Sequence, residues 1–411
     1  MTVATLRARS TKWRDQLTTD SRGNPKGSIG NVAIALRNDH QIELAWNEWT
    51  GRVEMLSAPP WEAQRWDGPR VFQESDVVGC IEHLERQHGI AGGPQHLGRV
   101  VEYIARERVV DPMGQWLNGL AWDGVPRVDA WLPRYLGTED SAVSRAVGRC
   151  WLIQAIARAC DPGCQADYVL VIEGRQGKRK ASALRALVGD GWFSDALPDI
   201  RTKDASLALQ GVWIFEIAEL DSIQGASDAA LKAFVTRRHE RFRAPYAATL
   251  QDWPRRCVFA ATTNERYYLR DGTGGRRWWP VEATSIDVDG LAADREQIWA
   301  EAHHLYRSGA RAWIDDRDGP VFEALQEAQE DRRGLSRWEE TIAAYLDARE
   351  PGEAVEAEDL YQRLEIPMDR SDRSVSIQLG QIVTSLGWVG VQRRIRGARR
   401  RVYVRAEESG R

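Results

Sequence analysis

Residues 168–182 read YVLVIEGRQGKRKAS, and this stretch predicts the fold of the central part of the chain. Tyr168–Ile172 is a continuous apolar run with β-branched side chains, which is typical of a strand buried in a parallel sheet. The loop after it contains Gly174 and Gly177, and a helix is expected from Ser182. A strand, a glycine-containing loop and a helix N-terminus form a phosphate cradle, because backbone N–H groups and the helix dipole attract an anion.

The lysine of this loop, Lys180, has the spacing from Gly174 that a P-loop requires, and it would reach the β and γ phosphate oxygens. Two positions depart from the P-loop pattern. Arg179 replaces its second glycine, and Ala181 replaces the Ser or Thr whose hydroxyl normally holds Mg²⁺. The motif alone fits a basic loop entering a helix equally well. The residues expected to contact ATP are Gly174, Gln176, Gly177, Lys180 and Ser182.

Two further apolar runs, Val212–Ile217 and Cys257–Ala261, predict neighbouring strands. A helical segment at 182–188 lies between the runs at 168–172 and 212–217, another at 226–236 lies between the second and third runs, and a further one follows at 291–306, so the alternation predicts an α/β sheet. The first run carries Glu216 near its end, where a carboxylate could hold Mg²⁺ or polarise water beside a triphosphate.

Other polar residues follow in the order that such a site needs. Glu219 and Asp221 come soon after the first run, and Asn264 after the second could orient an attacking water. Arg276 and Arg277 could stabilise charge on a transferring phosphate. Each has a simpler interpretation: a carboxylate at a strand end, a turn asparagine, a surface charge pair. Their order along one α/β unit favours a nucleotide site.

Short motifs between about residues 111 and 306 make the chain resemble the virulence-associated E family. These are P-loop ATPases of phages, plasmids and pathogenicity islands that are similar to superfamily 3 helicases. The motifs are Trp122–Arg127, Tyr135–Gly137, Glu173-Gly174, Gln176-Gly177, Trp192–Asp195, Lys203-Asp204, Trp213-Ile214, Glu216, Glu219-Leu220, Lys232–Phe234, Arg243, Pro245-Tyr246, Thr262–Asn264 and Arg276–Pro280.

The resemblance implies an ATP- and Mg²⁺-dependent motor on DNA, assembled as a homo-oligomeric ring. By this resemblance Lys180 is the P-loop lysine and Asn264 the sensor. The Walker B acids are Glu216 and Glu219, Mg²⁺ would be held by Glu216 and Ser182, and Arg276 or Arg277 would serve a neighbouring subunit's site.

The departures at Arg179 and Ala181 predict weakened hydrolysis. An arginine adopts positive φ only at a cost, and the lost hydroxyl removes one metal ligand. The alternative function is therefore a loader or regulator that binds nucleotide and DNA with little or no hydrolysis. A transcription regulator would leave the α/β unit unexplained.

Two arginine clusters are candidate DNA contacts. Residues 237–243 lie between the two nucleotide-site strands, and in ring helicases this region lines the pore, so Arg241 and Arg243 would meet single-stranded DNA. Packing against the next subunit is the alternative. Residues 392–405 hold seven arginines and no acid, which favours phosphate contacts over a solvated charged tail. The expected contacts there are Arg393, Arg394, Arg396, Arg399, Arg400 and Arg401.

The fold class expected is α/β: a P-loop core of the AAA+/RecA-like kind, an N-terminal α+β and helical region, and a C-terminal winged helix. The domains expected are a small α+β unit at 1–95, a helical region at 96–164, the ATPase domain at 165–310 and the winged helix at 335–405. Further elements expected are strands at Val32–Leu36, Ile42–Trp46 and Arg52–Leu56, helices at 78–88, Val128–Tyr135, Ala146–Ala159 and Ser374–Leu386, a capping box of Ser336 and Glu339, and a hairpin at Trp388–Arg405.

Composition limits the class of protein. The chain has 411 residues with a net charge of −4, so any nucleic-acid signal is local. Five scattered cysteines do not indicate a disulfide framework, and Cys160 and Cys164 lack the second ligand pair of a zinc motif. Without an apolar N-terminal core or a long apolar run, we expect a cytoplasmic protein with no membrane partner.

Overall fold

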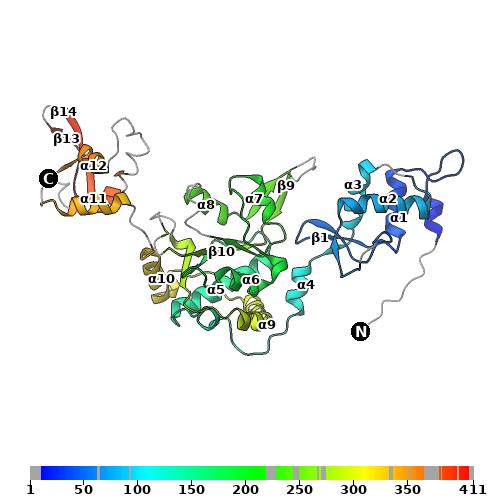
Figure 1. Cartoon of the computed structure of the whole chain (residues 1–411), viewed down its shortest axis with the longest axis horizontal. Helices are drawn as coiled ribbons and strands as arrows, with labels where there is room; N and C mark the ends of the chain where they lie inside the picture. The colour runs from blue at the N-terminus through cyan, green and yellow to red at the C-terminus, as the bar shows by residue number, and fades with distance from the viewer. Residues whose placement is uncertain are drawn as a thin grey trace.

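The structure is a computed structural model of the chain. It describes residues 11–62, 65–91, 94–218, 228–243, 250–265, 268–269, 275–332, 337–350, 353–364, 379–380, 382–395 and 398–406. Their elements form three groups that follow one another along the long axis of Figure 1, from the N-terminal group in blue to the C-terminal group in red.

The N-terminal group is a four-stranded sheet packed against helices. The strand order is β3-β2-β1-β4, in which only the β1–β4 pair is parallel. Helices α1, α2 and α3 share one hydrophobic core with this sheet. The elements are η1 (Thr11–Gln16), α1 (Ile29–Asn38), β1 (Leu44–Asn47), β2 (Arg52–Met55), β3 (Arg70–Val71), α2 (Glu74–His88), α3 (Pro94–Ala105) and β4 (Val109–Val110).

The strand expected at Val32–Leu36 is wrong, because these residues lie in helix α1. The Ser28 side chain caps this helix by accepting a hydrogen bond from the Asn31 N–H at 3.3 Å. Two alanines and a leucine, which favour a helix, alternate there with Val32 and Ile34, which favour a strand. The helix propensity of the former and the Ser28 cap outweigh the strand preference of the two β-branched residues. The strands expected at Ile42–Trp46 and Arg52–Leu56 are present within two residues as β1 and β2.

Three elements lead from this group into the centre: α4 (Pro112–Gly119), the π-helical turn η2 (Leu132–Leu136) and α5 (Ala142–Cys160). The helix expected at Val128–Tyr135 is wrong in extent. Pro133 lacks an N–H and clashes inside a helix, so it is tolerated only in the first turn of η2. Helix α3 belongs to the N-terminal core, whereas α5 belongs to the central one.

The central group is a five-stranded parallel sheet in the order β11-β5-β10-β7-β6. Along β5, Leu170 and Ile172 enter one core while Val169 and Val171 enter the other, so the strand is buried on both faces. Helices α5, α6 and α9 cover the first face, and α7 and α8 cover the second. The mixed α/β class expected for this part is confirmed.

The central group contains the following helices and strands. They are β5 (Val169–Glu173), α6 (Lys180–Val188), η3 (Asp190–Trp192), β6 (Phe193–Ser194), α7 (Lys203–Ala208), β7 (Ile214–Ile217), α8 (Asp228–Val235), the antiparallel pair β8 (His239–Phe242) and β9 (Gln251–Pro254), β10 (Val258–Thr263), η4 (Gly275–Arg277), β11 (Trp278–Glu282), α9 (Val288–Arg307), η5 (Asp316–Asp318) and α10 (Pro320–Glu330).

The C-terminal group has a three-stranded sheet in the order β12-β14-β13, with its own hydrophobic core. Its elements are α11 (Arg337–Asp347), β12 (Val355–Glu356), α12 (Ala357–Arg363), β13 (Trp388–Ile395) and β14 (Ala398–Arg405). Ser336 of the expected capping box, and much of the helix expected at Ser374–Leu386, lie outside the described residues. In the described part of the chain, no helix combines the length and apolar character needed to cross a bilayer.

Candidate functional site: a nucleotide site at the edge of the parallel sheet

The lysine of the loop after β5 contacts the residues that the sequence places around it. Lys180 opens helix α6, and its Nζ donates to the Gly174 carbonyl at 2.6 Å, to Asn264 Oδ1 at 2.8 Å and to the Arg175 carbonyl at 3.3 Å. Its side chain is buried, and burial lowers the pKa of its amine, although Glu216 opposes this shift. Three of the expected site residues, Gly174, Lys180 and Asn264, thus meet at one point.

The loop itself needs glycine at one position and lacks it at another. Gly174 has φ +146°, and a Cβ there would lie 2.7 Å from the Ala283 carbonyl oxygen, so a side chain would clash. Gly177 also has positive φ, at +82°. Arg179 adopts the left-handed conformation, with φ 63° and ψ 29°, and is the one non-glycine residue with positive φ in the described chain. An arginine therefore holds the backbone shape that glycine adopts without strain.

The carboxylate expected beside the phosphates lies on β7 and is buried. Glu216 Oε1 accepts a hydrogen bond from Thr262 Oγ1 at 2.7 Å, and Oε2 has no hydrogen-bond partner among the described residues. Burial raises the pKa of Glu216, whereas the Thr262 hydrogen bond and Lys180 lower it. A buried carboxylate oxygen without a partner is costly unless a cation or water meets it.

The position next to the lysine carries no oxygen. Ala181 and Ser182 occupy the first turn of α6 and are partly exposed. Glu219, the second expected acid, and Asp221 lie outside the described residues.

Two polar pairs near the loop had no role in the sequence interpretation. Glu173 ends β5, and its carboxylate accepts hydrogen bonds from Arg332 at 2.8 and 2.9 Å and from the Tyr268 hydroxyl at 2.7 Å. Asp195, just after β6, pairs with Arg185 of α6 at 3.2 Å. Glu173 and Asp195 stand in family-like motifs, but nothing in the sequence indicates their basic partners.

The two arginines expected to act on phosphate are not at this edge of the sheet. Arg276 and Arg277 form η4 directly before β11, whose first residue, Trp278, pairs with Val169 at the start of β5. Because β5 and β11 are parallel, these arginines lie at the edge opposite to the P-loop. Within one chain, the structure does not bring them to Lys180.

The basic cluster at 237–243 lies on the β8–β9 pair. Arg241 forms an ion pair with Asp252 across the two strands at 2.9 Å, and both side chains are mostly exposed. Arg243 is exposed at the end of a described segment. A cavity of about 430 Å³ lies beside this pair rather than at the P-loop, with Trp46 and Trp253 among its lining residues.

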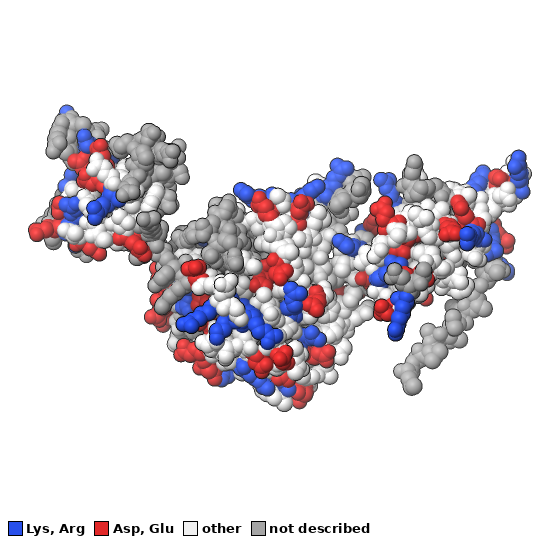
Figure 2. Space-filling model, in the orientation of Figure 1, with Lys and Arg blue, Asp and Glu red and all other residues white. Residues whose placement is uncertain are grey.

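The C-terminal hairpin sets arginines opposite arginines. Arg393 pairs with Arg400, and Arg394 with Arg399, in the β13–β14 register. Arg400 also forms ion pairs with Glu356 at 2.9 Å and Glu358 at 2.7 Å, so acids outside the hairpin balance part of its charge. Arg401 lies over the Tyr403 ring at 5.6 Å, whereas Arg396 is outside the described residues. Figure 2 shows basic and acidic side chains intermingled over the visible face of the molecule.

Comparison with known proteins gives a family and a set of distant structural likenesses. No curated protein matches the sequence. Three apo structures of the NrS-1 C-terminal region are similar over 89% of this chain and 96–97% of theirs, with 12–13% identity and TM-scores of 0.48, 0.43 and 0.47. The virulence-associated protein E-like domain matches residues 117–333, which include β5, the P-loop, β7, β10 and η4. This match spans more than half of the chain, and the chain therefore belongs to the virulence-associated protein E-like family of P-loop NTPases.

Proposed function

We propose that the chain is an ATP-dependent, helicase-like motor that acts on DNA during replication of a phage, plasmid or genomic island. The observation that carries this proposal is the hydrogen bond from Lys180, which follows β5, to Asn264, which follows β10, with the buried Glu216 of β7 close enough to act electrostatically on the lysine. In this arrangement the lysine would hold the β and γ phosphates of ATP, and the asparagine and glutamate would orient and polarise the attacking water.

The residues at this edge fit a nucleoside triphosphate in part. Gly174 lets the loop pass close to the Ala283 carbonyl, and Lys180 supplies a cation whose partners among the described residues are oxygens of the loop backbone and Asn264. Glu216 Oε2, which has no hydrogen-bond partner in the described part of the chain, fits Mg²⁺ or a water of its shell. ATP would supply the phosphoanhydride bond whose cleavage drives the motor.

The ring and the DNA contacts belong to the same proposal. Arg276 and Arg277 lie at the sheet edge opposite to the P-loop of their own chain, so their proposed role is to act on a neighbouring subunit's nucleotide in a homo-oligomeric ring. Helices α11 and α12, followed by the arginine-bearing β13–β14 hairpin, support a winged helix that binds duplex or forked DNA. Arg241 and Arg243 would contact single-stranded DNA.

A specific observation favours a second function. Ala181 offers no hydroxyl to Mg²⁺, and Arg179 holds a strained backbone conformation. Both features favour a loader or regulator that binds nucleotide and DNA but hydrolyses ATP slowly or not at all.

Steady-state ATP hydrolysis by the full chain, with and without single-stranded DNA, tests the proposal. A motor should hydrolyse ATP faster with DNA, and Glu216→Gln should remove this activity. Glu282→Gln is the matched control, because Glu282 ends β11, another strand of the same sheet, but is exposed. Binding of ATP and DNA without hydrolysis would favour the loader, and failure to bind ATP would contradict both functions.

A further inference from the structure

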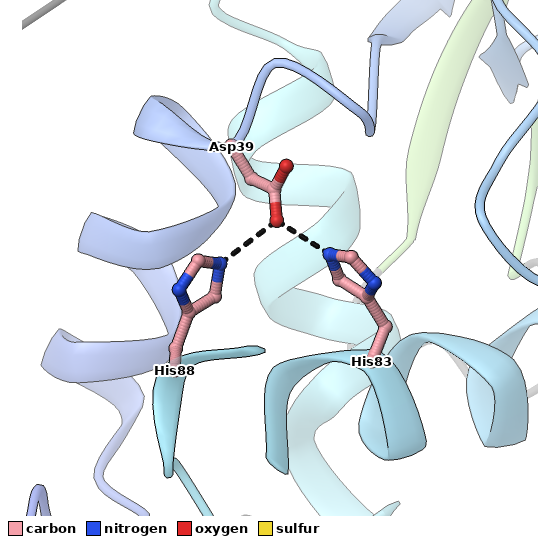
Figure 3. A group of neighbouring side chains, drawn as sticks. All are labelled: Asp39, His83 and His88. Atoms are coloured by element: carbon pink, nitrogen blue, oxygen red, sulfur yellow. Dashed lines mark hydrogen bonds and ion pairs between the residues drawn. The ribbon is translucent and has the colours of Figure 1, made fainter. Parts of the chain in front are cut away.

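Three side chains of the N-terminal group converge on one point, far along the chain from the nucleotide site (Figure 3). Asp39 caps the end of α1, and His83 and His88 come from the last two turns of α2. Asp39 Oδ2 lies 2.6 Å from His83 Nε2 and 2.8 Å from His88 Nε2, so one carboxylate oxygen faces both imidazoles. All three potential ligand atoms lie within 4.8 Å of one another.

The cluster is held in place by its surroundings. Asp39 and His83 are each 7% exposed. The Trp61 ring lies 6.2 Å from His83, and the Trp13 ring lies 5.1 Å from His88. The Gln41 backbone N–H binds the second carboxylate oxygen of Asp39 at 2.9 Å. The imidazoles and the carboxylate therefore have little freedom to turn away from one another, and a preorganised ligand set binds an ion without a large ordering cost.

The chemistry of the cluster fits a metal cation. Its buried carboxylate faces two imidazole nitrogens, and carboxylate oxygen and imidazole nitrogen are both ligands that Zn²⁺ accepts. Arg14 donates to His88 Nδ1 at 3.2 Å, so this nitrogen is an acceptor and the ring proton sits on Nε2. The cluster thus places one buried carboxylate between two imidazole rings.

The ligand atoms need only a small displacement to hold a metal ion. In a tetrahedral site, two ligands at the usual zinc distances lie about 3.3–3.4 Å apart, so each nitrogen would have to move roughly 0.5–0.8 Å from the carboxylate oxygen that it now contacts at 2.6 or 2.8 Å. Two imidazoles and one carboxylate are the three protein ligands of many sites that leave a fourth position to water. For an ion to bind, each ring proton must move from Nε2 to Nδ1, and the Arg14–His88 hydrogen bond must break.

We propose that Asp39, His83 and His88 bind a divalent transition-metal ion of the zinc class, which fastens the end of α1 to the end of α2. The observation that carries this proposal is the convergence of the two Nε2 atoms on one oxygen of a buried carboxylate. The site shares no residue with the P-loop. This proposal can therefore be right or wrong independently of the proposed motor function. Its sequence signal is weak, because Asp39 and His88 are 49 residues apart.

Calorimetric titration of the chelator-treated, nucleotide-free full chain with Zn²⁺ tests the proposal. We expect one ion per chain. His88→Gln should weaken the affinity at least about tenfold, since even the loss of an outer partner has an effect of that size. His40→Gln is the matched control, because His40 follows Asp39 directly but is exposed and outside the cluster. Unchanged affinity in His88→Gln and in His83→Gln would overturn the site.

Two further measurements keep the test valid if those variants fold poorly. Zinc-edge X-ray absorption of the unmodified chain should show only nitrogen and oxygen ligands at about 2.0–2.2 Å, whereas a sulfur ligand at about 2.3 Å would assign the ion to cysteines instead. Arg14→Ala should tighten Zn²⁺ binding severalfold, because it frees His88 Nδ1 and removes a nearby positive charge. Absence of any bound Zn²⁺ would leave the three residues as a hydrogen-bonded structural cluster and overturn the proposal.

Discussion

The two sides of the nucleotide site differ in how far they keep the P-loop pattern. On the lysine side, Lys180 contacts both the loop backbone and Asn264. On the metal side, Glu216 is in place and buried, but Ala181 supplies no oxygen opposite it. The lysine neutralises phosphate in both the ground state and the transition state, whereas Mg²⁺ coordination also sets the geometry of phosphoryl transfer. Changes on the lysine side should therefore alter the affinity for ATP, and changes on the metal side should alter the rate of hydrolysis.

The largest expected effect is a loss of ATP affinity when the lysine side is changed. We expect Lys180→Ala to weaken ATP binding on the order of tenfold to a hundredfold, because a charge-assisted hydrogen bond contributes about 1.5–3 kcal/mol. Titration with a fluorescent ATP analogue measures this change. Lys178→Ala is the control in the same loop, since Lys178 instead donates to the Thr284 carbonyl at 3.0 Å. Equal losses in the two variants would contradict the special role of Lys180.

A change on the metal side should alter the rate of ATP hydrolysis rather than the affinity for ATP. Ala181→Ser restores a hydroxyl at the position that normally holds Mg²⁺, so we expect the ATPase rate to rise about tenfold, equivalent to about 1.4 kcal/mol in the barrier. The affinity for ATP should change much less. Steady-state kinetics with Mg²⁺ in excess separates these two quantities.

Ser182→Ala tests whether Ser182 supplies the Mg²⁺ ligand that Ala181 lacks. If Ser182, one residue later in α6, already holds the ion, its loss will lower the rate and Ala181→Ser will add nothing. Adding Glu216→Gln to Ala181→Ser should remove the gain, because the repaired site still depends on the buried carboxylate.

The sequence predicts the strand, loop and helix around Lys180 well because their signal is local. The strand, the glycines and Lys180 lie within about fifteen residues, and backbone preferences and the apolar run fix their arrangement. The strand that carries Glu216 and the strand that precedes Asn264 follow from the same alternation of apolar runs and helices. Because these strands are parallel to β5, Glu216 and Asn264 lie on the side of the sheet where β5 leads into the loop of Lys180.

Contacts between distant segments could not be predicted in this way. Glu173 and Arg332 are 159 residues apart, and no pattern in the sequence pairs them. The cluster of Asp39 and two histidines depends on how α1 meets α2, and the segment Val32–Leu36 before it suggests a strand when read alone. Chain topology, rather than local propensity, decides such contacts.

The smallest effect should come from Arg179, which lies between the two sides. Its left-handed conformation disfavours a residue with a Cβ by about 1–2 kcal/mol, while glycine has an entropic disadvantage of about 0.5–1 kcal/mol in the unfolded chain. Arg179→Gly should therefore stabilise the nucleotide-free protein by about 0.5–1 kcal/mol and raise its thermal unfolding midpoint by about 1–3 °C. Differential scanning calorimetry measures this change.

Gly177→Ala is the control for this prediction, because it makes the opposite change, from glycine to a residue with a Cβ. Gly177 also has positive φ, at +82°, and a Cβ there would meet no atom within 4 Å, so backbone conformation alone decides the effect. We expect its unfolding midpoint to fall by a similar amount, since a residue with a Cβ is placed where glycine is favoured. A midpoint that falls in Arg179→Gly as well would mean that the arginine side chain makes contacts that outweigh its strain. The loop would then depend on arginine at this position, and the departure from the P-loop pattern would be an adaptation of the site rather than a loss.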